Sequence, residues 1–199
     1  MNLKSLICYV VLGILLMGSG IVVSCDSFNE DLPECRLLVK FKYDYNMEFA
    51  DAFHAQVDKV ELYIFDKDGK FMFKQAEEGS ALSTGNYLME VELPVGQYQF
   101  MAWAGARDSY DITLLTPGVS TITDLKLKLK REASLIINKK METLWYGEII
   151  GVNFTGTEHQ TETINLIRDT KIVRFGFQSY TGTWTLDMND YDYEIIESN

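Results

Sequence analysis

The sequence contains few of the residues on which most catalytic sites depend. Its 199 residues include only two histidines, three cysteines and three prolines. His54 and His159 lie far apart in the chain, and neither has cysteine or acidic neighbours at the spacing of a metal site. Nucleophile-elbow, P-loop and dinucleotide-binding motifs are absent as well. The sequence therefore predicts a protein that is not an enzyme, with no catalytic residues, no metal and no cofactor.

Positive charge is also scarce. The chain has 18 lysines and arginines against 29 acidic residues, which gives a net charge of −11. A surface of this sign repels nucleic-acid phosphates and anionic lipid headgroups, so we expect no nucleic-acid partner. Apolar residues are plentiful at 47%, which is enough to build a packed core.

The first 24 residues have the pattern of a secretory signal peptide. Lys4 precedes an apolar run over 6–23, and the sequence Val22-Val23-Ser24-Cys25 matches the lipobox of bacterial lipoproteins. In such proteins the cysteine thiol accepts a diacylglyceryl group, and cleavage before the cysteine frees an amine for further acylation. We therefore expect Cys25 to be lipidated, and its acyl chains, at ~0.8 kcal/mol per buried CH2, to anchor the protein to a membrane. The alternatives are a signal peptide whose cysteine is incidental and a transmembrane anchor.

Residues 25–35 form an acidic tether in this interpretation. Removal of residues 1–24 takes away one lysine and no acid, so the net charge becomes −12. An acidic stretch directly after the lipidated cysteine resembles a signal for export to the outer face of the outer membrane; the alternative is a solvated spacer. Cys35 then has no partner for an intrachain disulfide, and we expect a small unreactive residue near the first strand, with a free surface thiol as the alternative.

Alternation of apolar and polar residues dominates the rest of the chain and predicts many short strands. The expected strands cover 36–43, 57–65, 71–74, 87–93, 97–103, 121–129, 134–138, 144–154, 162–168, 171–177, 183–186 and 191–196. One short helix is expected over 47–56. Short strands separated by turn residues are typical of an antiparallel β-sandwich or barrel, so the predicted fold class is all-β.

The segment Asp66-Lys67-Asp68-Gly69 can be interpreted in two ways. It resembles the start of a calcium-binding loop, with Glu77 in the place of the closing acid. However, Lys70 and Lys74 fall where further ligands would be needed, and their cations would repel calcium. An Asp-Gly pair between two apolar runs is a hairpin signal, because glycine adopts positive φ without a Cβ clash. We therefore expect a hairpin.

Tryptophans and paired acids could instead form a sugar-binding or glycosidase site. Trp103, Trp145 and Trp184 each lie inside a predicted strand, so we expect them to pack in the core. Asp190 and Asp192 lie near a predicted turn, where solvation explains them more simply than catalysis.

An ordered series of segments resembles a known family. The segments are Cys25-Asp26-Ser27-Phe28-Asn29-Glu30-Asp31, Tyr43-Asp44-Tyr45-Asn46, Val57-Asp58-Lys59-Val60-Glu61-Leu62-Tyr63-Ile64-Phe65-Asp66, Leu93-Pro94-Val95-Gly96-Gln97-Tyr98, Ala102-Trp103-Ala104-Gly105, Leu144-Trp145-Tyr146-Gly147 and Ile164-Asn165-Leu166-Ile167-Arg168-Asp169. Their order and the lipobox together resemble the FimB-type family of fimbrial anchor lipoproteins from Bacteroides-type bacteria.

The resemblance implies a fold, a location and a partner. It implies an antiparallel transthyretin-like β-sandwich over 36–157, followed by a second, incomplete β-sandwich domain over 158–199. It also implies a lipid-anchored outer-membrane protein, exposed at the cell surface, that tethers the pilin subunits of a fimbrial shaft and supports cell adhesion. Docking of the pilin would use strand complementation, in which a strand of one protein adds to an open sheet edge of the other.

Two alternatives remain open at the level of sequence. Some forty residues give only three or four strands of ~5–6 residues each, too few for a closed sandwich. The chain is therefore expected to be either a truncated member or one whose second domain needs a partner strand. The rival function is that of a surface glycan-binding β-sandwich lipoprotein, which exposed coplanar tryptophans would favour.

Overall fold

The computed structural model describes residues 35–131, 139–157 and 159–174, together with residues 176, 180, 182, 187 and 189. The predicted signal peptide, Cys25 and residues 26–34 of the tether lie outside the described residues. Among the residues that are described, no helix is both long and apolar enough to cross a membrane.

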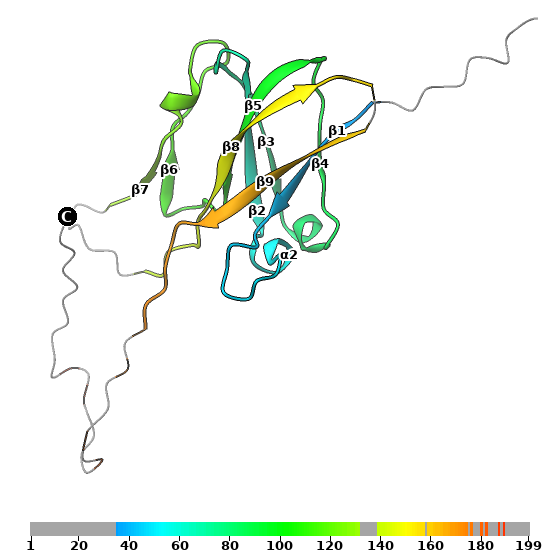
Figure 1. Ribbon diagram of the computed structural model, residues 1–199. Coiled ribbons are helices and arrows are strands. Elements are labelled where there is room, and N and C mark those ends of the chain that lie inside the picture. Colours follow the sequence, from blue (N-terminus) through cyan, green and yellow to red (C-terminus); the bar gives the residue numbers. More distant parts are fainter. Residues whose placement is uncertain are drawn as a thin grey trace, which may run out of the picture.

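The described chain is built almost entirely of strands, which confirms the predicted all-β class (Figure 1). In chain order the elements are β1 (Leu37–Lys42), α2 (Phe53–Gln56), β2 (Lys59–Asp66), β3 (Phe71–Glu78), η2 (Ser80–Ser83), β4 (Met89–Val91), β5 (Gly96–Ala104), β6 (Tyr110–Ile112), η3 (Ile122–Asp124), β7 (Leu127–Leu129), β8 (Trp145–Phe154) and β9 (Gln160–Arg168). Seven strands form one sheet in the order β3-β2-β5-β8-β9-β1-β4, and β6 pairs with β7 in a small second sheet.

One pairing departs from the expected antiparallel arrangement. Strand β1 pairs with β9 in parallel, with Leu37 opposite Gln160 and Lys42 opposite Asn165, while every other strand pair within the described residues is antiparallel. Parallel neighbours need a long crossover, and here the connection is almost the whole described chain. The two strands run side by side across the molecule in Figure 1, so both begin at the same end of the sheet.

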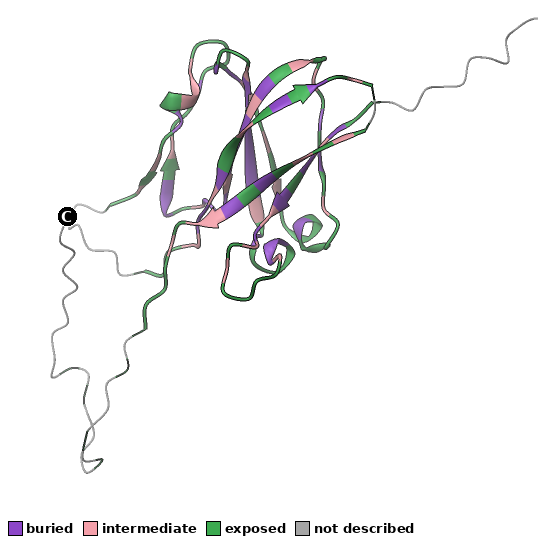
Figure 2. Ribbon diagram, in the orientation of Figure 1, coloured by how far each residue is buried: buried purple, intermediate pink, exposed green. Residues whose placement is uncertain are grey.

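Two hydrophobic clusters explain why β2 is buried on both faces. Val60, Leu62 and Ile64 are fully buried in the main cluster, which the curled sheet encloses. Tyr63 and Phe65 point to the other face, where a second cluster packs them against the segment that contains Leu115 and Leu125. Figure 2 shows buried residues along the strands and exposed residues at the loops. A strand buried on both faces loses the alternation that marks a half-exposed strand.

Several expected elements differ in length or position. The helix expected over 47–56 is one turn, Phe53–Gln56, and the strand expected over 121–129 is strand only at Leu127–Leu129. Residues 171–174 of the strand expected over 171–177 are not strand. Residues 122–124 instead form η3, because Thr121 and Asp124 make reciprocal capping hydrogen bonds that favour a helical turn. The strands expected over 134–138, 183–186 and 191–196 lie outside the described residues.

The expected boundary between two domains after residue 157 needs a correction. Strand β9 begins at Gln160, within the part assigned to the second domain, but it pairs with both β1 and β8. Ile164 and Leu166 of this strand are buried in the main cluster. The first domain therefore extends at least to Arg168. A second domain over the remaining residues stays a prediction, because most of 175–199 lies outside the described residues.

Candidate functional site

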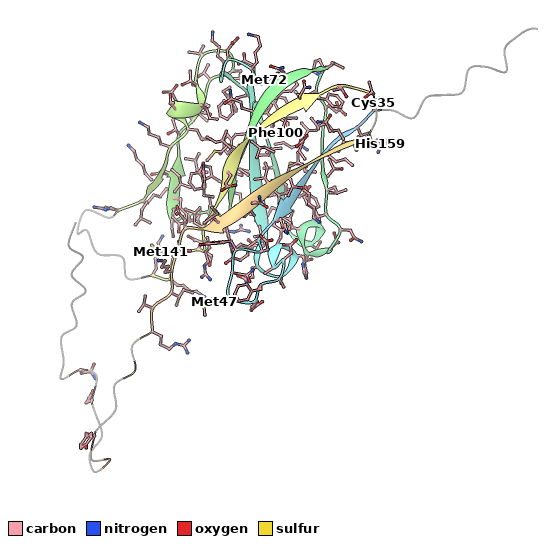
Figure 3. The ribbon with its side chains drawn as sticks, in the orientation of Figure 1. Cys35, Met47, Met72, Phe100, Met141 and His159 are labelled. Atoms are coloured by element: carbon pink, nitrogen blue, oxygen red, sulfur yellow. The ribbon has the colours of Figure 1, made fainter. Side chains whose placement is uncertain are left out.

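Cys35, the last residue of the predicted tether, lies at one end of the sheet. Cys35 lies two residues before β1, is exposed, and its Sγ donates a hydrogen bond to the carbonyl oxygen of Gly156 at 2.7 Å. Figure 3 shows Cys35 and His159 at this end, far from Met47 and Met141 at the other. Cys35 is thus the surface thiol that the sequence left as the alternative. Cys25, ten residues earlier, lies outside the described residues, and its lipidation stays a prediction.

The Asp66–Lys70 segment is a hairpin turn between β2 and β3, as expected. The Asp66 carboxylate accepts hydrogen bonds from the backbone N–H groups of Asp68 and Lys70, both at 2.9 Å. Gly69 adopts a φ of 75°, which glycine permits without strain. The Oδ1 atom of Asp66 is thus used by the turn. The described part of the chain contains no group of three or more His, Cys, Asp or Glu residues that could hold a metal ion.

The tryptophans do not form an exposed platform within the described residues. Trp145 is 3% exposed and lies in the main cluster, as predicted. Trp103 is half-buried and packs edge-on against Tyr146 with ring centroids 5.4 Å apart. Trp184 and the paired acids Asp190 and Asp192 lie outside the described residues, whereas His54 and His159 are both exposed.

The open edges of the seven-stranded sheet form the most distinctive surface feature. Strands β3 and β4 terminate the sheet, and curling brings them toward each other, so that the Gln75 side chain donates a hydrogen bond to the carbonyl oxygen of Glu90 at 2.9 Å. A groove of about 410 Å³ lies here, lined by Phe73, Gln75, Glu90 and Glu92. We refer to these four residues as the edge groove.

Most of the outer edge of β3 has no partner strand among the described residues. Its first residue, Phe71, is already bonded to a loop, because its N–H donates to Ser120 and its carbonyl oxygen accepts from Gly118, each at 2.8 Å. From Met72 to Glu78 no strand of the described residues pairs with the outer edge. Unpaired backbone N–H and C=O groups along an edge are a template for strand addition.

A buried ion-pair network holds β3 against β2. Glu61 is 6% exposed, and its carboxylate accepts a hydrogen bond from Lys74 of β3 at 2.9 Å and one from the Tyr63 hydroxyl at 3.2 Å. Burial, together with the negative charge of Glu61, raises the pKa of Tyr63. Because Lys74 of β3 binds a carboxylate of β2, this network holds β3 in position against β2.

Sequence patterns identified the strands of this site but not the site itself. The strand expected over 71–74 in fact extends to Glu78. Its second half, Lys74-Gln75-Ala76-Glu77-Glu78, is mostly polar and lacks the alternation from which strands were predicted. Charged residues on a strand are typical of an edge, and this was the available signal. Which two strands end the sheet depends on long-range pairing, which periodicity does not report.

Comparison with known proteins places the chain in a family. The family model of the fimbrillin-A associated anchor proteins Mfa1 and Mfa2 matches residues 32–199. A curated relative, the minor fimbrium anchoring subunit Mfa2 of Porphyromonas gingivalis, is 29% identical over 131 residues, which cover 64% of this chain and 40% of the relative.

Solved structures of similar chains agree with this family. A candidate polysaccharide-binding protein from Bacteroides thetaiotaomicron is 92% identical with a TM-score of 0.76, covering 79% of this chain and 55% of the solved one. The fimbrial anchor protein Mfa2 from Porphyromonas gingivalis shares the fold at 23% identity, with a TM-score of 0.55, over 68% of this chain and 50% of that one. This chain thus spans about half the length of the relatives it matches. The chain belongs to the family of fimbrillin-A associated anchor proteins Mfa1 and Mfa2.

Proposed function

We propose that this protein is a lipid-anchored outer-membrane subunit that holds a fimbrial shaft at the cell surface. Cys25 carries the lipid, and a strand of a pilin subunit adds to the outer edge of β3. Membership of a family of structural anchor proteins supports this role over catalysis. The observation that carries the proposal is the β3 edge from Met72 to Glu78, which pairs with no strand in the part of the chain that the structure describes and lies beside the edge groove.

The edge groove suggests what kind of strand it takes. An extended strand of seven residues is about 23 Å long and can pair along the whole free edge of β3. Glu90 and Glu92 line the groove, and Glu90 is already paired with Arg36 at 3.4 Å. A pilin strand that places a lysine or arginine beside Glu92 is therefore favoured. The incoming strand would displace the hydrogen bond between Gln75 and Glu90 and replace it with a backbone ladder.

Membrane attachment is tested with a matched pair of cysteine variants. Cys25→Ala removes the predicted lipid site, whereas Cys35→Ala removes the only other cysteine of the chain after residue 24. Fractionated cells that carry a tagged protein should retain wild type and Cys35→Ala in the outer membrane and release Cys25→Ala. Retention of Cys25→Ala would show that a different segment anchors the protein.

Strand addition is tested with two neighbouring prolines on β3. Successive N–H groups of an antiparallel strand point to alternate sides, so one of Gln75→Pro and Ala76→Pro removes a bond to β2, and the other removes only an outward N–H. The variant that keeps the wild-type melting temperature identifies the outward position. We expect that variant to lose most of the pilin that wild type co-purifies. Equal pilin recovery from it and from wild type would exclude the β3 edge as the docking site.

Glycan binding is the second candidate, because the 92% identical solved structure is described as a candidate polysaccharide-binding protein. The buried Trp145 and half-buried Trp103 give it little support, since neither offers an open ring face. A wild-type protein that stays in the membrane, brings down no pilin and is retarded on immobilised polysaccharide would favour this function.

A further inference from the structure

The parallel strands β1 and β9 begin at the same end of the sheet. Cys35 and His159, which lie shortly before the two strands in the chain, are close together at that end (Figure 3). Their pairing is continuous along the whole of β1, and we call it the β1–β9 ladder. In Figure 1, β9 runs beside β1 and ends on the far side of the sheet from the start of β1. The predicted tether therefore enters β1 at one end of the ladder, and the chain leaves β9 at the other, after Arg168.

The β1–β9 ladder joins β1 to the larger part of the sheet. On its other side β1 pairs with β4, which is the terminal strand of the sheet among the described residues. Strand β9 in turn pairs with β8 through its final residues, from Leu166 to Arg168. A force that enters β1 from the tether thus reaches the other strands through this ladder and through the packing of side chains around it.

The direction of such a force decides how the ladder resists it. Adjacent strands that are pulled from opposite ends can separate only by sliding, so all their hydrogen bonds carry the load together. Strands that are pulled from the same end open one pair at a time. Because β1 and β9 are parallel, a pull between the tether and the chain beyond β9 acts at opposite ends of the ladder. In an antiparallel pair the chain would leave at the tether end, and the same pull would open the pairs in turn.

Buried side chains on both strands also oppose sliding. The residues concerned are at most 2% exposed and lie in the main cluster; they are Leu37, Val39 and Phe41 of β1 and Ile164 and Leu166 of β9. A shift of one residue between strands turns side chains that face the core toward solvent, so it costs the burial of these residues as well as the hydrogen bonds.

The end of β1 that is remote from the tether is held separately. The backbone N–H of Tyr43, directly after β1, donates to the Asp51 carboxylate at 3.0 Å, and its carbonyl oxygen accepts from the N–H of Ala52 at 2.8 Å. Its ring is buried and packs edge-on against Trp145, with centroids 5.9 Å apart. Movement of β1 toward the tether would break these contacts too.

We propose that the β1–β9 ladder is the load-bearing element of this protein and resists tension between the tether and the chain beyond β9 by shear. The origin of the tension rests on the membrane attachment proposed above. A shaft docked at β3 would load the same ladder, because within the described sheet β3 is connected to β1 only through β9. The parallel pairing in an otherwise antiparallel sheet then has a mechanical function.

Single-molecule pulling in two geometries tests the proposal. In the chain after residue 24, Cys25→Ser leaves Cys35 as the one natural cysteine, to which one handle is attached. Lys171→Cys places the second handle beyond β9, and His159→Cys places it directly before β9; both positions are exposed. At one pulling rate, the protein with handles at 35 and 171 should unfold at a severalfold higher force than the one with handles at 35 and 159. Equal forces would overturn the proposal.

Two prolines on β9 test whether the ladder itself carries the load. The N–H of Gln160 donates to the carbonyl oxygen of Arg36 at 2.9 Å. Because N–H groups alternate in direction along a strand, that of Glu162 points to β1 and that of Thr163 points away. With handles at 35 and 171, Glu162→Pro should lower the unfolding force, whereas Thr163→Pro should leave it close to that of the protein without proline.

Heat unfolding first shows that both proline variants are folded. Equal unfolding forces in the two folded variants would assign the load to other contacts and overturn the proposal; if Glu162→Pro does not fold, the comparison of the two pulling geometries decides. Neither measurement involves a membrane or a pilin. A negative result is therefore distinct from a failure of the proposed anchoring role, which the cysteine variants in cells test separately.

Discussion

At the scale of single residues, Gly105 is the position where the backbone most restricts the sequence. It directly follows β5, has a φ of +73°, and its N–H donates to the carbonyl oxygen of Lys59 at 2.8 Å. A Cβ at this position would overlap the carbonyl oxygen of Thr143 and lie 2.8 Å from Cζ3 of Trp145. Glycine at position 105 is therefore required by the close approach of Thr143 and Trp145 to the end of β5.

Gly105→Ala should lower the free energy of unfolding by about 3 kcal/mol, because it adds a steric clash to the cost of left-handed backbone. Gly118→Ala is the matched control, since Gly118 also has a φ of +73° but no atom within 4 Å of its would-be Cβ. That variant should lose only about 1 kcal/mol. Urea unfolding followed by tryptophan fluorescence measures both, and equal losses would contradict the steric argument.

At the scale of elements, β9 joins the two parts of the seven-stranded sheet. It lies between β8 and β1, and it supplies Ile164 and Leu166 to the main cluster. Without it β1 and β4 would be separated from the rest of the sheet. A sheet that has lost a central strand exposes two new edges and part of its core.

Shortening the chain tests this role directly. A protein that ends at residue 157 lacks β9 and should not unfold cooperatively, whereas one that ends at residue 174 should retain the whole sheet. Near-ultraviolet circular dichroism and heat unfolding distinguish the two. Cooperative unfolding of the shorter protein would restore the domain boundary that the sequence alone predicts.

At the scale of the whole molecule, tyrosines in and beside both hydrophobic clusters make the stability of the fold depend on alkaline pH. Burial raises the pKa of Tyr98 in the main cluster and, with Glu61, that of Tyr63 in the second. Burial, with a contribution from Glu77, raises the pKa of Tyr87 to about 12. In each case the folded state favours the neutral phenol over the charged phenolate.

Stability should therefore fall as the pH rises above 10. Tyrosines of the unfolded chain lose their protons near pH 10, while these folded tyrosines keep theirs to higher pH. The unfolded state then binds fewer protons, so the free energy of unfolding decreases with pH. Urea unfolding at neutral pH and above pH 10 measures the decrease. Tyr63→Phe should reduce this decrease in the free energy of unfolding, whereas Tyr45→Phe should leave it unchanged, because Tyr45 is exposed. The same decrease in both variants would contradict the role given to Tyr63.

The sequence could predict strands that have strong alternation or a continuous apolar run, because these patterns depend only on neighbouring residues. Residues 59–66, 96–104 and 145–154 are strands close to their expected bounds. Elements that depend on neighbours were missed, such as β6, whose three residues are strand only because β7 pairs with them. The extended segment 171–174 has strand-like residues but no partner strand within the described residues.

By itself the sequence determined the all-β class, the hairpin at Gly69 and the family resemblance, because alternation, turn chemistry and ordered motifs are local properties of a chain. Only the tertiary structure decided that β9 joins the sheet in parallel with β1, and that β3 and β4 are the terminal strands of that sheet among the described residues. These features depend on which distant segments pair, and pairing is set by burial and geometry across the whole chain rather than by any one stretch of it.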